Sequence, residues 1–191
     1  MEKRRSSLLF LAAAALSVVL TAMGWWSGRA AAGGSAGDTV ASTFPQKGSV
    51  VPDLALPALR TDGPPWIGTD TLRLSDFRGR WVYLDVFGSW CPPCRTKQPK
   101  MLEIADRLKE EGAMVLGLLL EDSPQTAAEW LAANGGVPYP YLVLDEETKR
   151  AWGITGAPMG FLVSPEGRLE RLCFGCSRGR DAVGTLPDAI W

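Results

Sequence analysis

The sequence predicts an α/β domain with a central mixed sheet flanked by helices, joined to an apolar N-terminal segment. Patterns of buried strands alternate with helical patterns in the middle of the chain, which is typical of a β-α-β unit. Two more strand patterns with a turn between them indicate a β-β-α second half. With 191 residues, of which 46% are hydrophobic and 21% charged, the chain is long enough for one domain and an appendage.

The N-terminal segment has the length and the flanks of a membrane anchor. An almost uninterrupted apolar run covers residues 8–26, and as a helix its 19 residues roughly span a bilayer core of about 30 Å. Basic residues within 2–5 precede the run, which predicts a cytoplasmic N-terminus and an extracytoplasmic remainder. We therefore expect one transmembrane helix within residues 1–26, with the domain on the periplasmic side of the cell membrane.

A cleaved signal sequence is the alternative for residues 1–26, because three alanines at 30–32 supply a cleavage site of the A-x-A kind. Both alternatives deliver the domain to the same compartment. Residues 27–49 are rich in Gly, Ala, Ser and Thr without apolar periodicity, so we expect a flexible linker there. The predicted domain then covers residues 50–191.

The elements of the domain follow from apolar spacing and turn residues. Ser123 and Pro124 have the pattern of a helix cap followed by a first-turn proline, and Pro165 with Gly167 indicates a tight turn. Residues 51–77 predict extra strands, an N-terminal β extension. The predicted strands are 81–87, 113–120, 141–144, 161–163 and 169–173, and the predicted helices are 91–110, 125–134, 146–152 and 180–190.

Composition and charge exclude several classes of function. Twenty basic and 21 acidic residues leave a net charge of -1, so there is no electrostatic basis for binding nucleic acid. The chain has no histidine, which excludes Cys-His nucleophile pairs, zinc sites that need imidazole and c-type haem attachment. Its four cysteines form two C-x-x-C pairs, a pattern typical of redox or metal sites.

The first pair, Cys91 and Cys94, lies between a predicted strand and a predicted helix. Unpaired N–H groups and the positive dipole end at a helix N-terminus lower the pKa of a thiol. Pro92 and Pro93 fit the early helical positions and leave Cys91 open to a partner protein. Cys91 is then the nucleophile and Cys94 the resolving thiol. A zinc site, the common alternative for C-x-x-C, needs ligands that the domain hardly offers, so we expect no metal.

The stretch Phe87-Gly88-Ser89-Trp90-Cys91-Pro92-Pro93-Cys94-Arg95 resembles the active-site segment of the TlpA/ResA/CcmG (DsbE) family of thioredoxin-like thiol-disulfide oxidoreductases. The resemblance covers about residues 50–191 and implies a thioredoxin-like fold. Its other motifs are Val51-Pro52-Asp53-Leu54, Leu74-Ser75-Asp76-Phe77-Arg78-Gly79, Thr155-Gly156-Ala157-Pro158, Phe161-Leu162-Val163 and Pro165-Glu166-Gly167.

The resemblance also implies how a substrate is held. Pro158 is expected to be a cis-proline that faces the cysteine pair, with the backbone of Ala157 available to an extended substrate peptide. From its position beside the cysteine pair, Trp90 is expected to shield the disulfide and to contact partners next to Pro92 and Pro93. The alternative is that it only packs beside the core strand. Where relatives usually carry hydroxylated or acidic residues after the proline, this chain has Met159 and Gly160, so it departs from the family pattern there.

Asp85 lies six residues before Cys91 in an otherwise apolar strand. A carboxylate there is costly without a partner, so we expect a raised pKa and predict that Asp85 carries the proton of Cys94. The alternative is an aspartate at the edge of the strand, partnered by solvent or a lysine. Lys97 takes the place where many ResA-like relatives carry an acidic residue, which leaves proton transfer to Asp85.

The second pair, Cys173 and Cys176, allows three hypotheses. It is a structural disulfide, a second redox pair that exchanges with Cys91 and Cys94, or a pair of thiols that stay reduced or bind metal transiently. Matching the predicted hairpin to the thioredoxin pattern places this pair on the rim of the active site. Exposed thiols seldom stay free in an oxidising compartment.

Together these observations predict an extracytoplasmic enzyme that exchanges dithiol and disulfide with proteins and needs no cofactor beyond its own cysteines. The resemblance implies a reductant of apocytochrome c or of a metal-site protein, supplied with electrons by a membrane donor of the DsbD/CcdA type. The alternatives are a general protein thiol oxidant and a chaperone that binds Cu(I) through the same cysteines.

Overall fold

The computed structural model describes residues 44–136 and 139–175. The predicted anchor at 8–26, most of the predicted linker, Cys176 and the predicted helix at 180–190 lie outside the described residues. Within these described ranges, no helix is both long enough and apolar enough to cross a bilayer.

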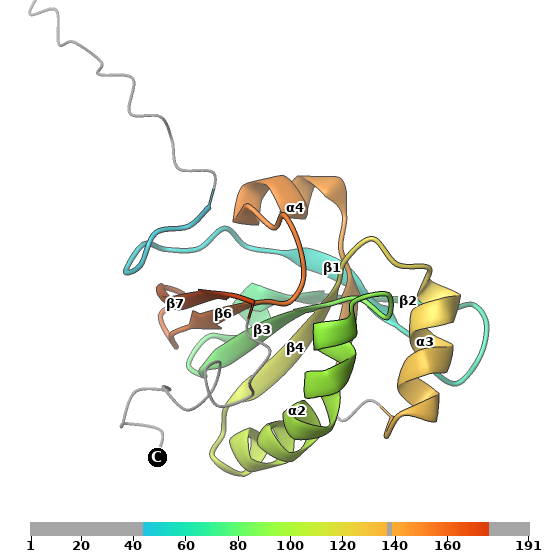
Figure 1. Ribbon diagram of the computed structural model, residues 1–191. Coiled ribbons are helices and arrows are strands. Elements are labelled where there is room, and N and C mark those ends of the chain that lie inside the picture. The colour runs from blue at the N-terminus through green and yellow to red at the C-terminus, as the bar shows by residue number, and fades with distance from the viewer. Residues whose placement is uncertain (1–43, 137–138, 176–191) are drawn as a thin grey trace, which may run out of the picture. The chain divides into compact units, whose positions relative to one another are not determined.

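A seven-stranded mixed sheet forms the centre of the domain (Figure 1). Its order is β2-β1-β5-β4-β3-β6-β7, in which β3, β4 and β5 are parallel and the outer strands pair antiparallel. The mixed sheet and its N-terminal β extension confirm the predicted fold. The strands are β1 (Ala55–Leu59), β2 (Ile67–Arg73), β3 (Val82–Phe87), β4 (Met114–Leu119), β5 (Tyr141–Val143), β6 (Met159–Val163) and β7 (Leu169–Phe174).

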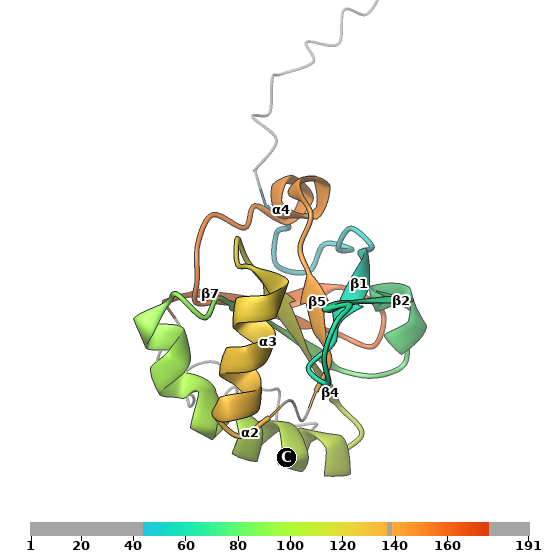
Figure 2. The same ribbon diagram turned by 90° about the vertical axis from the view of Figure 1, so that its right-hand side faces the viewer.

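Helices cover both faces of the sheet. The long helix α2 (Pro92–Glu110) and α3 (Pro124–Ala133) lie on one face, and α4 (Glu146–Trp152) lies on the other (Figures 1 and 2). A single 3-10 turn, η1 (Leu74–Phe77), leads from β2 toward β3. Two separate clusters of buried side chains result, one on each face of the sheet.

Side-chain caps define where the two shorter helices begin. The Ser123 hydroxyl accepts a hydrogen bond from the backbone N–H of Thr126, and the Asp145 carboxylate accepts one from that of Thr148. Both caps satisfy N–H groups that have no partner inside the helix. Helix α4 ends at Gly153, which adopts the left-handed conformation that favours glycine.

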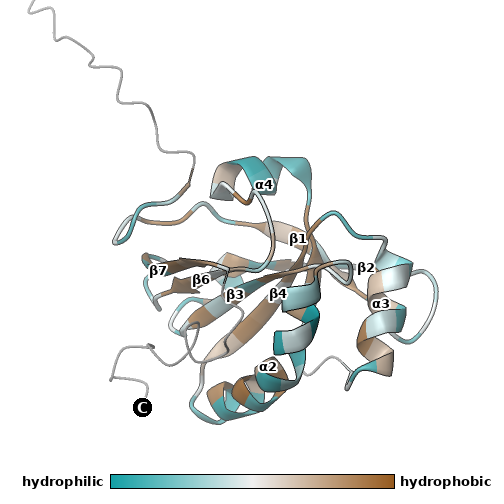
Figure 3. Cartoon of the chain, viewed as in Figure 1, coloured by the Kyte–Doolittle hydropathy of each residue, from teal (hydrophilic) through white to brown (hydrophobic). Residues whose placement is uncertain are grey.

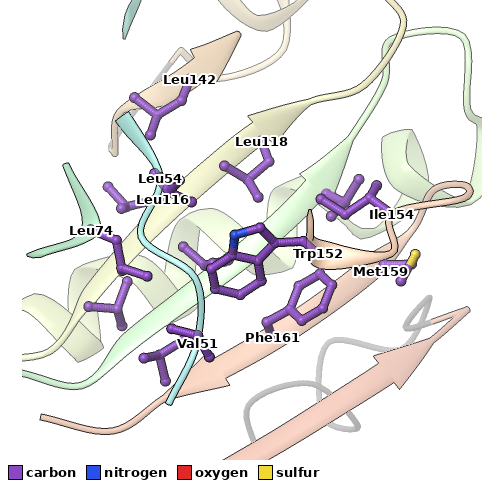
Figure 4. Packing of buried hydrophobic residues seen from close by; sticks show 14 of the residues in the cluster. Val51, Leu54, Leu74, Leu116, Leu118, Leu142, Trp152, Ile154, Met159 and Phe161 are labelled. Atoms are coloured by element: carbon purple, nitrogen blue, oxygen red, sulfur yellow. The ribbon is translucent and has the colours of Figure 1, made fainter. Parts of the chain in front are cut away.

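The core beneath α4 is built around Trp152, which is fully buried. Its ring packs edge-on against Phe161 of β6, with the ring centroids 5.2 Å apart (Figure 4). Strand residues supply most of the apolar surface, whereas the helices also carry hydrophilic positions (Figure 3). This arrangement follows from parallel strands that are covered on both faces and are therefore apolar on both.

The start of the described chain lies against β7. Gly48 donates its N–H to the carbonyl of Leu169, and Leu169 donates back to Ser49. The ring of Phe44 also meets that of Phe174, at a centroid distance of 6.2 Å. Residues 44–49, which we expected to belong to the linker, therefore contact the domain.

Two glycines flank Asp85 on the strands next to β3. Asp85 pairs with Gly117 of β4 on one side and with Gly160 of β6 on the other. A Cβ atom on Gly117 would lie 2.3 Å from the ring of Tyr141, and one on Gly160 would lie 2.2 Å from the Tyr83 hydroxyl. The absence of side chains at these two positions makes room for two tyrosines beside the carboxylate.

We predict that Gly160→Ala lowers the free energy of unfolding by about 1–3 kcal/mol, because the added methyl collides with the Tyr83 hydroxyl. Urea unfolding measures the loss, and it should be smaller in a Tyr83→Phe background, where the hydroxyl is gone. Gly156→Ala is the matched control, since a Cβ there meets nothing within 4 Å. Equal losses from the two alanine substitutions would contradict the packing described here.

Candidate active site

The cysteine pair lies at the start of α2, just after the turn that follows β3. Cys91 is the N-cap of α2, in an extended conformation, and Pro92 and Pro93 occupy the first two helical positions. Cys91 and Cys94 form a disulfide with their Cα atoms 5.3 Å apart. Both cysteines are buried, at 1% and 0% exposure, and the Cys91 sulfur accepts a hydrogen bond from the Cys94 N–H.

Trp90 stands beside the disulfide and is half exposed. Its indole Nε1 donates to the Leu120 carbonyl at 3.1 Å, and the ring lies against Gly88, where a Cβ would be 2.6 Å from Nε1. The ring orientation is therefore fixed although half of its surface is open to a partner. This geometry fits the predicted contact role, which stays a prediction.

Asp85 forms an ion pair with Lys97, and neither side chain has any exposed surface. Asp85 lies on β3 and Lys97 one turn after Cys94 on α2, so the pair joins the strand to the active-site helix. Burial raises the pKa of the Asp85 carboxyl above its ordinary value, and the Lys97 charge partly offsets this rise. The raised pKa of Asp85 agrees with the prediction from the sequence. The lysine partner, which the alternative prediction named, is Lys97.

A layer of buried polar side chains surrounds this ion pair. The Tyr141 hydroxyl donates to Gln98 Oε1 at 3.1 Å and lies 2.9 Å from the Tyr139 hydroxyl. Burial raises the pKa of Tyr139 and Tyr141, and the nearby Asp85 charge raises both further. The Tyr83 hydroxyl, Asp85 Oδ2 and Gln98 Nε2 are buried atoms that the described residues leave without a hydrogen-bond partner.

The sequence analysis did not predict this polar layer, although part of its signal was available. The buried face of α2 passes through Cys94, Met101, Ile104 and Leu108, and helical spacing places Lys97 with Gln98 on the same face. A lysine on an apolar helix face requires an anionic partner, and Asp85 is the buried carboxylate of the preceding strand. The tyrosines gave no comparable signal.

The peptide bond between Ala157 and Pro158 is cis, in agreement with the sequence prediction. Ala157 packs against the buried cluster that contains Cys91 and Cys94. The Pro158 carbonyl accepts a hydrogen bond from the Gly175 N–H, which ties the end of β7 to the loop before β6. The role of Ala157 and Pro158 in holding a substrate peptide remains a prediction.

Cys173 lies in the same row of the sheet as Asp85. Gly160 pairs with Asp85 on one side and with Cys173 on the other, so their side chains share the α2 face. Cys173 is disulfide-bonded in the described part of the chain. Cys176 lies outside the described residues, so the three hypotheses for this pair stay predictions.

Within the described ranges, no group of three or more histidine, cysteine, aspartate or glutamate side chains is placed to hold a metal ion. The described site consists of a disulfide at a helix N-terminus, an ion pair beneath it and a cis-proline loop at its side. These parts suit thiol-disulfide exchange, in which one sulfur is attacked and a buried acid-base group carries the proton.

Comparison with known proteins identifies the family of this site. The sequence model of the AhpC/TSA family matches residues 48–172, which include every element described above except the last residues of β7. The chain belongs to the AhpC/TSA family. The thioredoxin-like fold agrees with this membership.

Curated relatives of this AhpC/TSA chain are thiol-disulfide exchange proteins. Thiol-disulfide oxidoreductase ResA of Geobacillus kaustophilus is 29% identical over 136 residues, 70% of this chain and 72% of the relative. Thiol:disulfide interchange protein DsbE of Xylella fastidiosa is 34% identical over 124 residues, 63% of this chain and 57% of the relative.

Solved structures agree with these relatives. The crystal structure of a DsbE protein from Chlorobium tepidum has a TM-score of 0.58 at 30% identity, and the match covers 67% of this chain and 84% of that one. The thioredoxin domain of a Bacteroides vulgatus oxidoreductase has a TM-score of 0.62 at 22% identity, which supports the fold alone. The chain is therefore a thiol-disulfide oxidoreductase of the ResA and DsbE type, with Cys91 and Cys94 as its pair.

We predict that Lys97→Met makes stability fall more steeply as the pH rises. Because the pKa of Asp85 in the folded protein exceeds its ordinary value of 3.8, the folded state binds this proton more tightly than the unfolded chain does. The resulting stability is greatest below the ordinary pKa and is lost as the pH rises through the raised one. Without the Lys97 charge the pKa rises further, so the loss becomes larger.

Urea unfolding from below the ordinary pKa of 3.8 up to alkaline pH measures this effect, because the loss begins there and is complete above the raised pKa. Lys100→Met is the control, because Lys100 lies on the same helix and pairs with Glu103 in an exposed position. At alkaline pH the loss in Lys97→Met should approach the roughly 3–5 kcal/mol expected for an unpaired buried charge. Parallel pH curves for the two variants would show that Lys97 does not act on Asp85.

Proposed function

We propose that this protein reduces disulfides of other proteins outside the cytoplasm, in the maturation of cytochrome c or of a protein metal site. Its electrons come from a membrane donor of the DsbD/CcdA type, and residues 8–26 tether it to the membrane. The observation that carries the proposal is the buried Asp85–Lys97 pair, whose lysine lies one turn after Cys94 on the helix that begins with the Cys91–Cys94 disulfide. The similarity to ResA and DsbE proteins supports the same conclusion.

In the proposed reaction, the Cys91 thiolate attacks one sulfur of the substrate disulfide. The other substrate sulfur leaves as a thiolate and takes a proton, and a mixed disulfide joins the two proteins. Cys94 then transfers its proton to Asp85 and attacks the Cys91 sulfur. The second substrate sulfur leaves as a thiolate and takes up a proton from solvent, and Asp85 releases the proton of Cys94. The substrate has then gained two electrons and two protons, and Cys91 and Cys94 have become a disulfide.

The positions of the two cysteines on α2 support this division of roles. Cys91 is the N-cap at the end of the helix and follows the half-exposed Trp90, whereas Cys94 lies inside the first turn with no exposed surface. In this reaction the attack of Cys94 is therefore intramolecular and needs a base inside the domain. Asp85 is the buried carboxylate with a raised pKa on the strand beneath this helix. A base whose pKa is raised toward the working pH exchanges protons more effectively than an ordinary carboxylate.

We predict that the full chain has a reduction potential near the reducing end of the range, about -270 mV, rather than about -120 mV. Equilibration with glutathione buffers, followed by mass spectrometry of alkylated Cys91 and Cys94, measures it. The reduced protein should also open a disulfide in a C-x-x-C-H peptide faster than the disulfides of insulin. A strongly oxidising potential would favour the general oxidant, and tight Cu(I) binding without disulfide reduction would favour the copper chaperone.

We also predict that the double variant Asp85→Asn/Lys97→Met resolves its mixed disulfide about 10²-fold more slowly at neutral pH, because Cys94 has lost its base. Changing both residues avoids an unpaired buried lysine. Acid quenching and mass spectrometry of the Cys91 adduct give the rate. Asp106→Asn, an exposed change on the same helix, should leave it unchanged. Unaltered resolution in the double variant would exclude Asp85 as the proton carrier.

A further inference from the structure

A second carboxylate, that of Asp122, contacts the turn that precedes the nucleophile. Asp122 follows β4, and its Oδ2 atom accepts a hydrogen bond from the Ser89 N–H at 2.5 Å. Two residues earlier, the Leu120 carbonyl accepts from the Trp90 indole, and the Leu120 N–H donates to the carbonyl of Phe87 at 2.8 Å. The segment after β4 therefore holds the turn before Cys91 through three hydrogen bonds.

The backbone between these contacts has an unusual conformation. Glu121 has a φ of 45°, in the left-handed region that side-chain-bearing residues rarely adopt. Its carboxylate forms an ion pair with Lys149 of α4, which also pairs with Glu146. The bend at Glu121 allows Leu120 and Asp122, on either side of it, both to contact the turn. A residue keeps such an unfavourable backbone conformation only where the contacts around it hold it there.

The Asp122 carboxylate is close enough to Cys91 to act on its charge. Ser89 lies two residues before Cys91, so the hydrogen bond holds the carboxylate on the backbone at most about 7 Å, measured between backbone nitrogens, from the residue of the nucleophile. Charges beyond the Debye length of about 8 Å are largely screened where both are exposed to solvent, and much less where they are partly buried. The hydrogen bond is also partly buried, so solvent screens it less than an exposed contact. A negative charge at this range disfavours a thiolate.

We propose that Asp122 is a positioning residue for Cys91, which fixes the Ser89–Cys91 turn and whose negative charge disfavours the Cys91 thiolate. A reduced form with a poorly stabilised thiolate gives up its electrons more readily, so Asp122 biases the pair toward donating electrons. The inference rests on thiol-disulfide exchange at Cys91 and deepens the proposed reductant role. Nothing in it requires a particular substrate.

Two substitutions separate the charge from the hydrogen bond. Asp122→Asn keeps an oxygen that can accept from the Ser89 N–H and removes the charge, whereas Asp122→Ala removes both. Asp53→Asn is the matched control. The Asp53 carboxylate also accepts backbone hydrogen bonds, but from Leu54 and Ser75 rather than from the active-site turn.

The charge is tested on the reduced full chain by the pH dependence of iodoacetamide alkylation at Cys91, read by mass spectrometry. In both Asp122 variants the midpoint should fall by about half a pH unit, the size expected for one charge at this range in a solvated setting. At alkaline pH, where Cys91 is a thiolate, the equilibrium with glutathione should shift about three-fold toward the dithiol. A midpoint in Asp122→Asn equal to that of wild type and of Asp53→Asn overturns the electrostatic role.

The positioning role has its own measurement. Hydrogen exchange at the Ser89 amide should accelerate at least ten-fold in Asp122→Ala and stay close to wild type in Asp122→Asn, because the asparagine preserves the bond. Wild-type exchange in Asp122→Ala overturns this role. An oxidising potential in the wild-type protein would overturn the reductant function and leave both Asp122 effects in place, so the two failures are distinguishable.

Discussion

The buried ion pair between Asp85 and Lys97 is the interaction on which the active site depends. Removing two charges from water costs several kcal/mol per ion, and only close pairing with good geometry offsets this cost. The pair therefore holds α2 in one position over β3, because any shift of the helix would separate the charges. Since α2 carries Cys94 one turn before Lys97, the same constraint fixes the resolving sulfur.

The surroundings of the pair are adapted to it over four strands, β3 to β6. Gly117 and Gly160 leave the space that the tyrosines fill, so tyrosine side chains border the carboxylate. This packing maintains the burial that raises the pKa of Asp85. The acid-base property of a single side chain thus depends on residues of neighbouring strands that carry no chemistry themselves. The register of β3 with its neighbours therefore influences how tightly Asp85 binds its proton.

Local signals made much of this structure predictable from the sequence. The disulfide pair and the N-cap serine of α3 each depend on a few adjacent residues, the mixed sheet follows from apolar spacing, and the cis peptide bond at Pro158 was expected from the family resemblance. Contacts between side chains of neighbouring strands were harder to predict from the sequence. The approach of Tyr83 to Gly160 depends on strand register, which the sequence pattern did not determine. The contact of Asp122 with Ser89 joins two loops and has no periodic signal.

The two prolines at the start of α2 have a consequence for the charge state of the sulfur. A helix N-terminus solvates an anion mainly through the free N–H groups of its first turn, and proline has none. Because Pro92 and Pro93 fill the first two positions, the first N–H of the helix belongs to Cys94, and it already points at the Cys91 sulfur. An anion on that sulfur is therefore undersolvated compared with one at a proline-free helix start. The Pro-Pro dipeptide therefore limits how well the first turn of α2 can stabilise negative charge on the nucleophile.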